Sequence, residues 1–201
     1  MKIDNIIISV LLFIVVSTIL YYHYKYNRLV KVKSNVNGKK YKVRDIYNNM
    51  EAANILAEID NRLSFLKKYL INTNSDNQKL IKRVNRFDSS NLQESSRFSQ
   101  ATSFTINKKT LVLCMRSKQN ENTLKDLNTL MFVALHEFTH IVSDCFGHTS
   151  DYWSNFKYIL QLAIKINIYD KQNYNNNPEK YCGITINNSP LYLNSIKAKL
   201  T

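Results

Sequence analysis

The stretch LNTLMFVALHEFTHIVSDCFGH, from Leu127 to His148, decides the fold of this chain. Its apolar residues recur at the three- and four-residue spacing of a helix with a wide buried face. Asp126 or Asn122 can cap the first turn, and Gly147 can end the helix, because glycine adopts the left-handed conformation at helix ends without strain. We predict one long, largely buried helix that runs to a stop at Gly147.

Within this helix, His136-Glu137-Phe138-Thr139-His140 forms an HExxH motif. Residues four apart lie one turn above each other on the same helix face, so His136 and His140 can bind one metal ion together. Glu137 lies on the adjacent flank, within reach of a water molecule bound to that metal. The spacing predicts a Zn²⁺ site at which Glu137 activates the zinc-bound water for hydrolysis of a peptide bond.

A catalytic zinc ion takes three protein ligands and leaves one position open for water. His148 is the best third ligand, because a turn at Gly147 can bring the chain back toward the metal. Asp144 is the main alternative, but on a continuing helix it would lie about 12 Å from His136, at ~1.5 Å per residue. That distance is too long to share an ion, so we expect Asp144 to orient an imidazole instead. Asp151 is a weaker alternative.

Hydrolysis of a peptide bond also needs a donor to the oxygen that becomes negatively charged. Among the 13 tyrosines of the chain, Tyr152 and Tyr181 are candidates for this role. A protein or peptide substrate could add a strand to a neighbouring hairpin.

Residues 6–22 (IIISVLLFIVVSTILYY) contain no charged side chain. At ~1.5 Å per residue, this segment just spans a hydrocarbon core of ~30 Å. Tyrosines cluster at its end, as is common at a headgroup interface. The leader MKIDN is not basic enough for a secretory signal peptide, and no small-residue cleavage site follows. We predict a transmembrane anchor over residues 1–24, with residues 5–24 in the membrane.

The net charge of +13 is concentrated directly after this segment. Eight basic residues follow it with no acid between them: Lys25, Arg28, Lys31, Lys33, Lys39, Lys40, Lys42 and Arg44. Lys2 and Asp4 cancel, so subtracting these eight charges from the total leaves +5 for residues 45–201, and we expect no sequence-specific nucleic-acid binding. Because basic residues are retained on the cytoplasmic side, we predict a single-pass membrane protein, with the N-terminus outside and the catalytic domain in the cytoplasm. The cluster could also bind anionic lipid headgroups.

The remaining sequence indicates an α+β domain. Helical spacing covers 43–70, 77–87 and the stretch from Ser150 or Asp151 to Ile168. Apolar and polar residues alternate on both sides of Lys108-Lys109, which predicts a β-hairpin over 103–115. We interpret residues 25–43 as a basic tether, 88–100 as a loop, and the Asn- and Tyr-rich tail after Asp170 as irregular.

The three cysteines, Cys114, Cys145 and Cys182, are far apart and odd in number. They include no CxxC pair, so the sequence supports neither a disulfide framework nor a Cys-rich zinc site. We expect reduced, mostly buried thiols, which fits a reducing compartment.

Two groups of residues resemble known metallopeptidases. HEFTH followed by GHTSDYW resembles the WLM/SprT-like zincins, and TSFTINKKTLVLCMR and YCGITINNSPL look like metallopeptidases encoded by large DNA viruses. The resemblance covers roughly residues 100–192. It implies metal ligands at His136, His140 and His148, a catalytic Glu137, and an active-site helix beside a small sheet whose edge strand pairs with extended substrate. WLM proteins return the third histidine sooner and through Gly-Pro, so the spacer before His148 departs from their pattern.

These observations lead to one organisation: the anchor over 1–24, the tether over 25–43, and a mainly helical zincin-like domain over 44–201, with its core in 100–192. We predict a membrane-anchored zinc metallopeptidase, and the resemblance to viral proteins implies a virion or host membrane. The alternatives are a catalytically inert zincin-fold component of a membrane or virion, and a protease of the DNA–protein-crosslink type, the activity that the resemblance implies.

Overall fold

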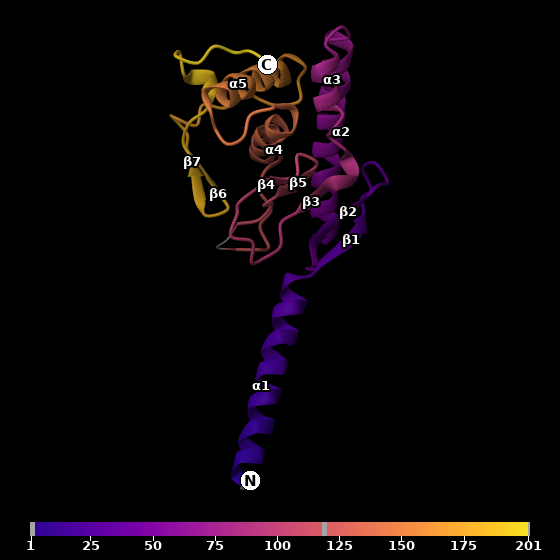
Figure 1. The fold of residues 1–201 in the computed structure, drawn as a ribbon, viewed down its shortest axis with the longest axis vertical. Helices are drawn as coiled ribbons and strands as arrows, with labels where there is room; N and C mark the ends of the chain where they lie inside the picture. Colours follow the sequence, from indigo (N-terminus) through magenta and orange to yellow (C-terminus); the bar gives the residue numbers. More distant parts are fainter. Residues whose placement is uncertain (1–2, 118–119, 201) are drawn as a thin grey trace.

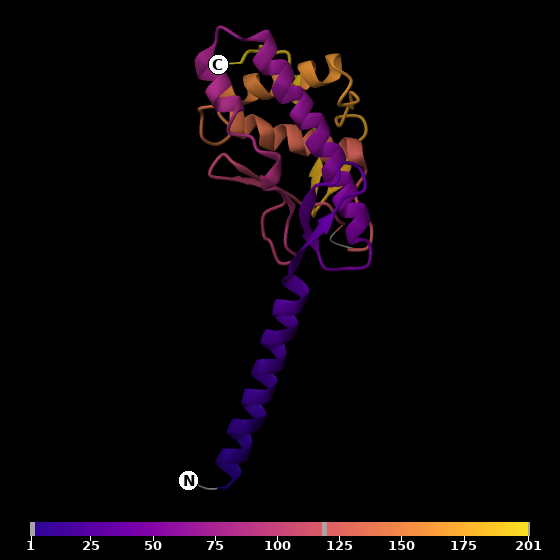
Figure 2. The same cartoon turned by 90° about the vertical axis from the view of Figure 1, so that its right-hand side faces the viewer.

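The computed structural model describes residues 3–117 and 120–200. Its first helix, α1 (Ile3–Asn27), projects from one end of the rest of the chain in two perpendicular views (Figure 1, Figure 2). All side chains of residues 5–26 are exposed, and the most apolar window of this helix has a mean hydropathy of 2.3. The helix is therefore long and apolar enough to cross a membrane.

A five-stranded mixed sheet follows α1, with strand order β1-β2-β3-β5-β4. The β1–β2 and β4–β5 pairs are antiparallel, while β2–β3 and β3–β5 are parallel. β4 lies at one edge of the sheet. The strands are β1 (Leu29–Lys33), β2 (Lys40–Arg44), β3 (Leu92–Glu94), β4 (Phe104–Ile106) and β5 (Thr110–Leu113).

Four helices form the core with this sheet. The longest, α2, packs against β1, β2 and β3, whereas α4 packs against β4, β5 and α2. α3 contacts both α2 and α4, and α5 packs on α4 (Figure 1). The predicted α+β class is therefore confirmed. The helices are α2 (Asn49–Thr73), α3 (Gln78–Val84), α4 (Leu127–Val142) and α5 (Ser150–Lys165), and a short 3-10 turn, η1 (Ser89–Asn91), precedes β3.

The segment 25–43 is not the tether that we predicted. α1 continues to Asn27, and β1 and β2 then pair over their full length. The prediction failed because lysines alternate with apolar residues in both strands, and the high charge of the segment hid this alternation. The apolar residues Val30, Val32, Tyr41 and Val43 face the core.

The predicted loop 88–100 contains the central strand β3. This strand is hard to recognise because it contains Glu94, which is fully buried. Its carboxylate accepts hydrogen bonds from the Arg44 backbone N–H at 2.8 Å and from Arg116 Nε at 2.6 Å. Since Arg116 is also buried, two charges that would each be costly alone compensate each other inside the sheet.

The predicted hairpin of 103–115 is present as β4 and β5. Asn107 and Lys108 form its turn with φ values of +52° and +53°. Asparagine adopts this left-handed conformation more readily than most residues, and the turn forms without glycine. The tail has more structure than we predicted: an antiparallel hairpin of β6 (Glu179–Tyr181) and β7 (Ile184–Ile186), and a 3-10 turn, η2 (Pro190–Tyr192), that packs on α5.

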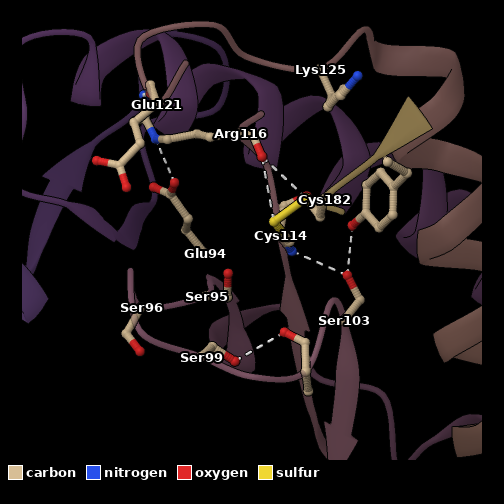
Figure 3. Close-up of a disulfide and its surroundings, with 12 residues drawn as sticks. Glu94, Ser95, Ser96, Ser99, Ser103, Cys114, Arg116, Glu121, Lys125 and Cys182 are labelled. Atoms are coloured by element: carbon tan, nitrogen blue, oxygen red, sulfur yellow. Dashed lines mark hydrogen bonds and ion pairs between the residues drawn. A yellow bond between two sulfur atoms is a disulfide. The ribbon is translucent and has the colours of Figure 1, made fainter. Parts of the chain in front are cut away.

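The expectation of reduced thiols is wrong for two of the three cysteines. Cys114 and Cys182 form a disulfide across 68 positions of the sequence (Figure 3). Cys145 is free. The bond joins the chain just after β5 to the chain just after β6. The spacing of the cysteines gave no sign of this pairing, because it depends on where the tail folds back.

Candidate metal centre

Helix α4 positions the HExxH residues. Its first turn is capped by Asp126, whose side chain accepts a hydrogen bond from the Thr129 backbone N–H at 2.8 Å. Most of its residues are buried, so the helix cannot rotate about its axis. His136 and His140 remain partly exposed on the same face, and their ring centroids lie 5.1 Å apart.

The third histidine arrives through the loop between α4 and α5. α4 ends at Val142, one turn earlier than the predicted stop, because Ser143 adopts an extended conformation with ψ of 148°. Gly147 has φ of +68°, the left-handed conformation that we predicted for it. The chain then reverses, and Thr149 caps α5 by accepting from the Tyr152 backbone N–H. His148 is thereby directed back toward α4.

The three imidazoles converge on one point. His148 Nε2 lies 3.0 Å from His136 Nε2 and 3.2 Å from His140 Nε2. All three ligand atoms lie within 4.8 Å of one another. Zinc–nitrogen bonds of about 2.0–2.1 Å at tetrahedral angles separate ligand nitrogens by about 3.3 Å. The donor set therefore fits a zinc ion that has three histidine ligands and an open fourth position.

The protonation of two of these histidines also suits a metal. Burial lowers the pKa of His136 to about 3 and that of His140 to about 4, and the neighbouring imidazoles add to both shifts. Both rings are therefore neutral at pH 7, which is the form that binds metal ions.

Glu137 lies beside the three histidines and is almost fully buried. Only 5% of its surface is exposed, and burial raises the pKa of its carboxyl to about 7. Thr105 Oγ1, from the edge strand β4, donates to Glu137 Oε2 at 2.8 Å and also lies 3.2 Å from the Glu137 backbone oxygen. A carboxyl group with a pKa near neutral can both accept and return a proton at physiological pH.

Asp144 does not orient an imidazole, contrary to our expectation. Its carboxylate pairs with Arg83 at 3.3 Å, Lys79 at 3.4 Å and Arg86 at 3.5 Å. All three cations come from α3 and the residues just after it. Asp144 therefore fastens the loop before His148 to α3. Asp151, the weaker alternative, pairs with Lys199 at 2.9 Å.

The two candidate tyrosines have different surroundings. The Tyr152 hydroxyl donates to the His136 backbone oxygen at 3.0 Å, and its ring stacks on His140 with centroids 4.2 Å apart. Tyr152, in α5, thus contacts both histidines of α4 and helps to hold their rings in place. The Tyr181 hydroxyl lies 2.6 Å from Ser103 Oγ, and Tyr181 lines the cleft in front of Glu137.

The site opens into a cleft of about 700 Å³. One wall is β4 and its flanks, and the other is the β6–β7 hairpin with the residues that follow it. The floor is α4 and the start of α5. Apolar side chains dominate beyond the histidines: Phe132, Val133, Trp153, Phe156, Ile184 and Ile186. This shape suits an extended peptide lying between the two walls.

Several supporting residues were not found from the sequence. Trp153 stacks on His148 with ring centroids 5.5 Å apart. Lys108, in the β4–β5 turn, donates to the backbone oxygens of Ser143 and Cys145 and so holds the His148 loop from the other side. The alternation of the hairpin could have placed Thr105 on one face, but only the tertiary structure pairs it with Glu137.

The comparisons with known proteins identify relatives in viruses. The "Uncharacterized protein R325" of Acanthamoeba polyphaga mimivirus is 34% identical over 188 residues, which covers 90% of this chain and 95% of that protein. This chain belongs to the R325 family. The expected likeness to viral proteins is thus confirmed.

Two further viral proteins match over a shorter part of the chain. "Uncharacterized protein 136R" of Invertebrate iridescent virus 6 is 41% identical over 70 residues, or 34% of this chain and 39% of that protein. "Uncharacterized protein 042R" of Invertebrate iridescent virus 3 is 40% identical over 68 residues, or 34% of this chain and 42% of that protein. No protein-family model matches the chain.

Among solved structures, the chain is similar to Wss1 from Saccharomyces cerevisiae. A mutant form matches with a TM-score of 0.49 and 21% identity, over 62% of this chain and 88% of that one. A second Wss1 structure matches with a TM-score of 0.47. A likeness of this strength concerns the course of the backbone and says nothing about activity or substrate.

Proposed function

We propose that this protein is a membrane-anchored, zinc-dependent peptidase. The observation that carries the proposal is the convergence of three imidazole nitrogens beside a buried carboxyl group at the floor of an open cleft. Histidine-only sites with an open position suit catalysis, whereas closed structural zinc sites favour cysteine. The resemblance of the HExxH stretch to zincins supports the same activity.

His136, His140 and His148 would hold the metal. When bound there, zinc supplies Lewis acidity toward a peptide carbonyl and toward water. Glu137 removes a proton from the attacking water as its oxygen bonds to the carbonyl carbon, and it delivers that proton to the nitrogen as the C–N bond breaks. Thr105 holds the Glu137 carboxylate in place during this exchange. Tyr181 is the better placed of the two tyrosines to donate to the carbonyl oxygen, because it lines the cleft.

The substrate would bind as an extended chain. β4 is the last strand of the sheet, so its outer edge has backbone groups that a peptide could pair with. The cleft lies along this strand, and its apolar lining would accept apolar side chains on the substrate. Protein substrates are therefore favoured over small molecules.

Helix α1 would anchor the enzyme in a bilayer. Its exposed apolar surface has no partner among the described residues, and lipid would cover it. Substrates near a membrane surface would thus reach the cleft more often than substrates elsewhere in the same compartment.

The decisive experiment measures metal and activity together. We expect purified full-length protein in detergent to contain about one zinc per chain and to cleave an unfolded protein such as casein. Glu137→Gln should keep the zinc and lose the activity, whereas His148→Ala should lose both. Full activity in the Glu137→Gln variant would reject the mechanism. A wild type with zinc but no cleavage of any unfolded protein would favour the inert alternative.

A further inference from the structure

The outer face of the β1–β2 hairpin presents four exposed lysines. The register places Lys31 opposite Lys42 and Lys33 opposite Lys40, so the four side chains lie on one face of the two-stranded ribbon. We call these four residues the lysine face. The opposite face of the ribbon is buried, because Tyr41 and Val43 pack into the core against α2. The lysine face therefore cannot turn inward.

The positive charges of this face are not compensated within the described part of the chain. Other cations of the hairpin region have acidic partners: Lys39 pairs with Asp60 at 2.9 Å and Arg28 with Asp45 at 3.8 Å. No ion pair is found for the lysine face among residues 3–117 and 120–200. Like charges directly opposite each other on a sheet are destabilising. The fold thus retains an electrostatic cost that an anionic partner would remove.

Protection of a sheet edge explains only half of this arrangement. Lysines on an edge strand discourage pairing with other chains, and β1 is an edge strand. That reason accounts for Lys31 and Lys33. It does not account for Lys40 and Lys42, because β2 is an interior strand with β1 and β3 on either side.

The position of the hairpin indicates the partner. β1 begins two residues after α1 ends, and the end of α1 contacts the loop after β3. His23 stacks on Phe98 with ring centroids 4.8 Å apart, and Arg97 lies over the Tyr26 ring at 5.2 Å. The hairpin therefore lies at the end of the domain nearest to the anchor (Figure 1). A charged surface acts over about 8–10 Å at physiological salt, and the Lys31–Lys42 pair lies at the part of the hairpin nearer to the end of α1.

We propose that the lysine face binds anionic phospholipid headgroups and holds the peptidase domain against the bilayer. The inference rests on the proposed anchor but not on the proposed peptidase activity. In this arrangement the domain lies on the membrane at a fixed orientation, and its cleft is presented at a constant height above the lipid.

The test uses full-length protein in vesicles that contain phosphatidylcholine and phosphatidylserine. A fluorescent amino acid at the exposed position Asn35 serves as energy donor. The acceptor is either phosphatidylserine or phosphatidylcholine, each labelled on its acyl chain and present in trace amount. We expect more transfer to labelled phosphatidylserine than to labelled phosphatidylcholine in the wild type. The ratio should fall to one when Lys31, Lys33, Lys40 and Lys42 are replaced by Gln, and it should also fall at high salt.

A matched control removes the same charge elsewhere. Replacing Lys68, Lys82, Lys165 and Lys197 by Gln should leave the ratio at its wild-type value, since these exposed lysines belong to α2, α3, α5 and the C-terminal segment and not to the hairpin. Melting curves check that both variants fold, and we expect the hairpin variant to be no less stable than the wild type.

Three outcomes overturn the proposal. A wild-type ratio of one excludes selective binding of anionic lipid. An unchanged ratio in the hairpin variant, with loss of affinity for duplex DNA, assigns the lysine face to nucleic acid. Extraction of the wild type by alkaline carbonate, with no transfer to either lipid, means that the anchor itself fails. In the first two outcomes the anchor and the peptidase stand.

Discussion

At the scale of single residues, the site depends on how Glu137 is held. Its carboxyl group is buried, which favours the neutral form, while the hydrogen bond from Thr105 favours the charged form. Burial is the larger effect, so the pKa lies near 7 instead of near 4.5. The balance gives a base that is about half ionised at neutral pH and still basic enough to take a proton.

Replacing Thr105 by Val should therefore shift the pH dependence of the reaction. Loss of the hydrogen bond removes stabilisation of the charged carboxylate and raises the pKa of Glu137 further. We expect the acidic limb of the kcat/KM profile to move to higher pH, so that activity falls more at pH 6 than at pH 8. Thr110→Val, on the neighbouring strand, is the control. An unshifted limb in Thr105→Val would show that this bond is not made during the reaction.

Asp144 acts through the loop that holds His148. Replacing it by Asn removes the charge that three cations share, and the loop loses its attachment to α3. We expect zinc affinity to fall about tenfold, as when supporting residues around metal ligands are lost. Competition with a chelator measures this, and Asp151→Asn, whose carboxylate pairs with Lys199, is the control. Equal affinities in both variants would contradict the assigned role.

At the scale of elements, the parts with strong local signals were predicted. The helical spacing, with Asp126 as one of two candidate caps, placed α4, and the alternation around Lys108 placed β4 and β5. Each of these signals lies within one element, so it can be read without knowing its neighbours.

The elements that were missed depend on distant partners. β3 is polar in sequence because Glu94 serves Arg44 and Arg116, which lie far away along the chain. The β6–β7 hairpin is short, and it is held by the disulfide at Cys182 and by the contact of Tyr181 with Ser103. His136 and His140 could be named from their spacing, and His148 from the turn at Gly147 and the resemblance to zincins, but the attachment of the His148 loop to α3 could not be predicted.

The disulfide fixes the wall of the cleft that the β6–β7 hairpin forms. In the chain-entropy model, closing a loop of 68 residues contributes about 4 kcal/mol to the free energy of unfolding. We expect the double variant Cys114→Ala/Cys182→Ala to lose an amount of this order in urea unfolding. Cys145→Ala removes a thiol outside the bond and should change stability far less. Equal losses in the two variants would mean that the bond adds nothing.

At the scale of the whole molecule, two features bear on which side of the membrane the domain occupies. The basic residues after α1 predict the cytoplasmic side. A disulfide is typical of oxidising compartments. The basic residues are retained on the cytoplasmic side while the chain inserts into the membrane, before the domain folds and the disulfide can form. We therefore expect these residues to set the orientation of the protein in the membrane.

Tags at the two ends test this expectation. When only the plasma membrane is permeabilised, an antibody should reach the tag at the C-terminus, while the tag at the N-terminus should stay protected. The reverse pattern would place the domain on the oxidising side and make the disulfide a normal product of its folding.

The bond between Cys114 and Cys182 also encloses every candidate metal ligand and the candidate base. His136, His140, His148 and the base Glu137 all lie between the two cysteines in the sequence, so the oxidised chain holds them inside one closed covalent ring. A single backbone cut anywhere within that ring leaves the two fragments joined. A peptidase that nicks its own copies would therefore keep its metal ligands together, and the nick would be visible only after reduction.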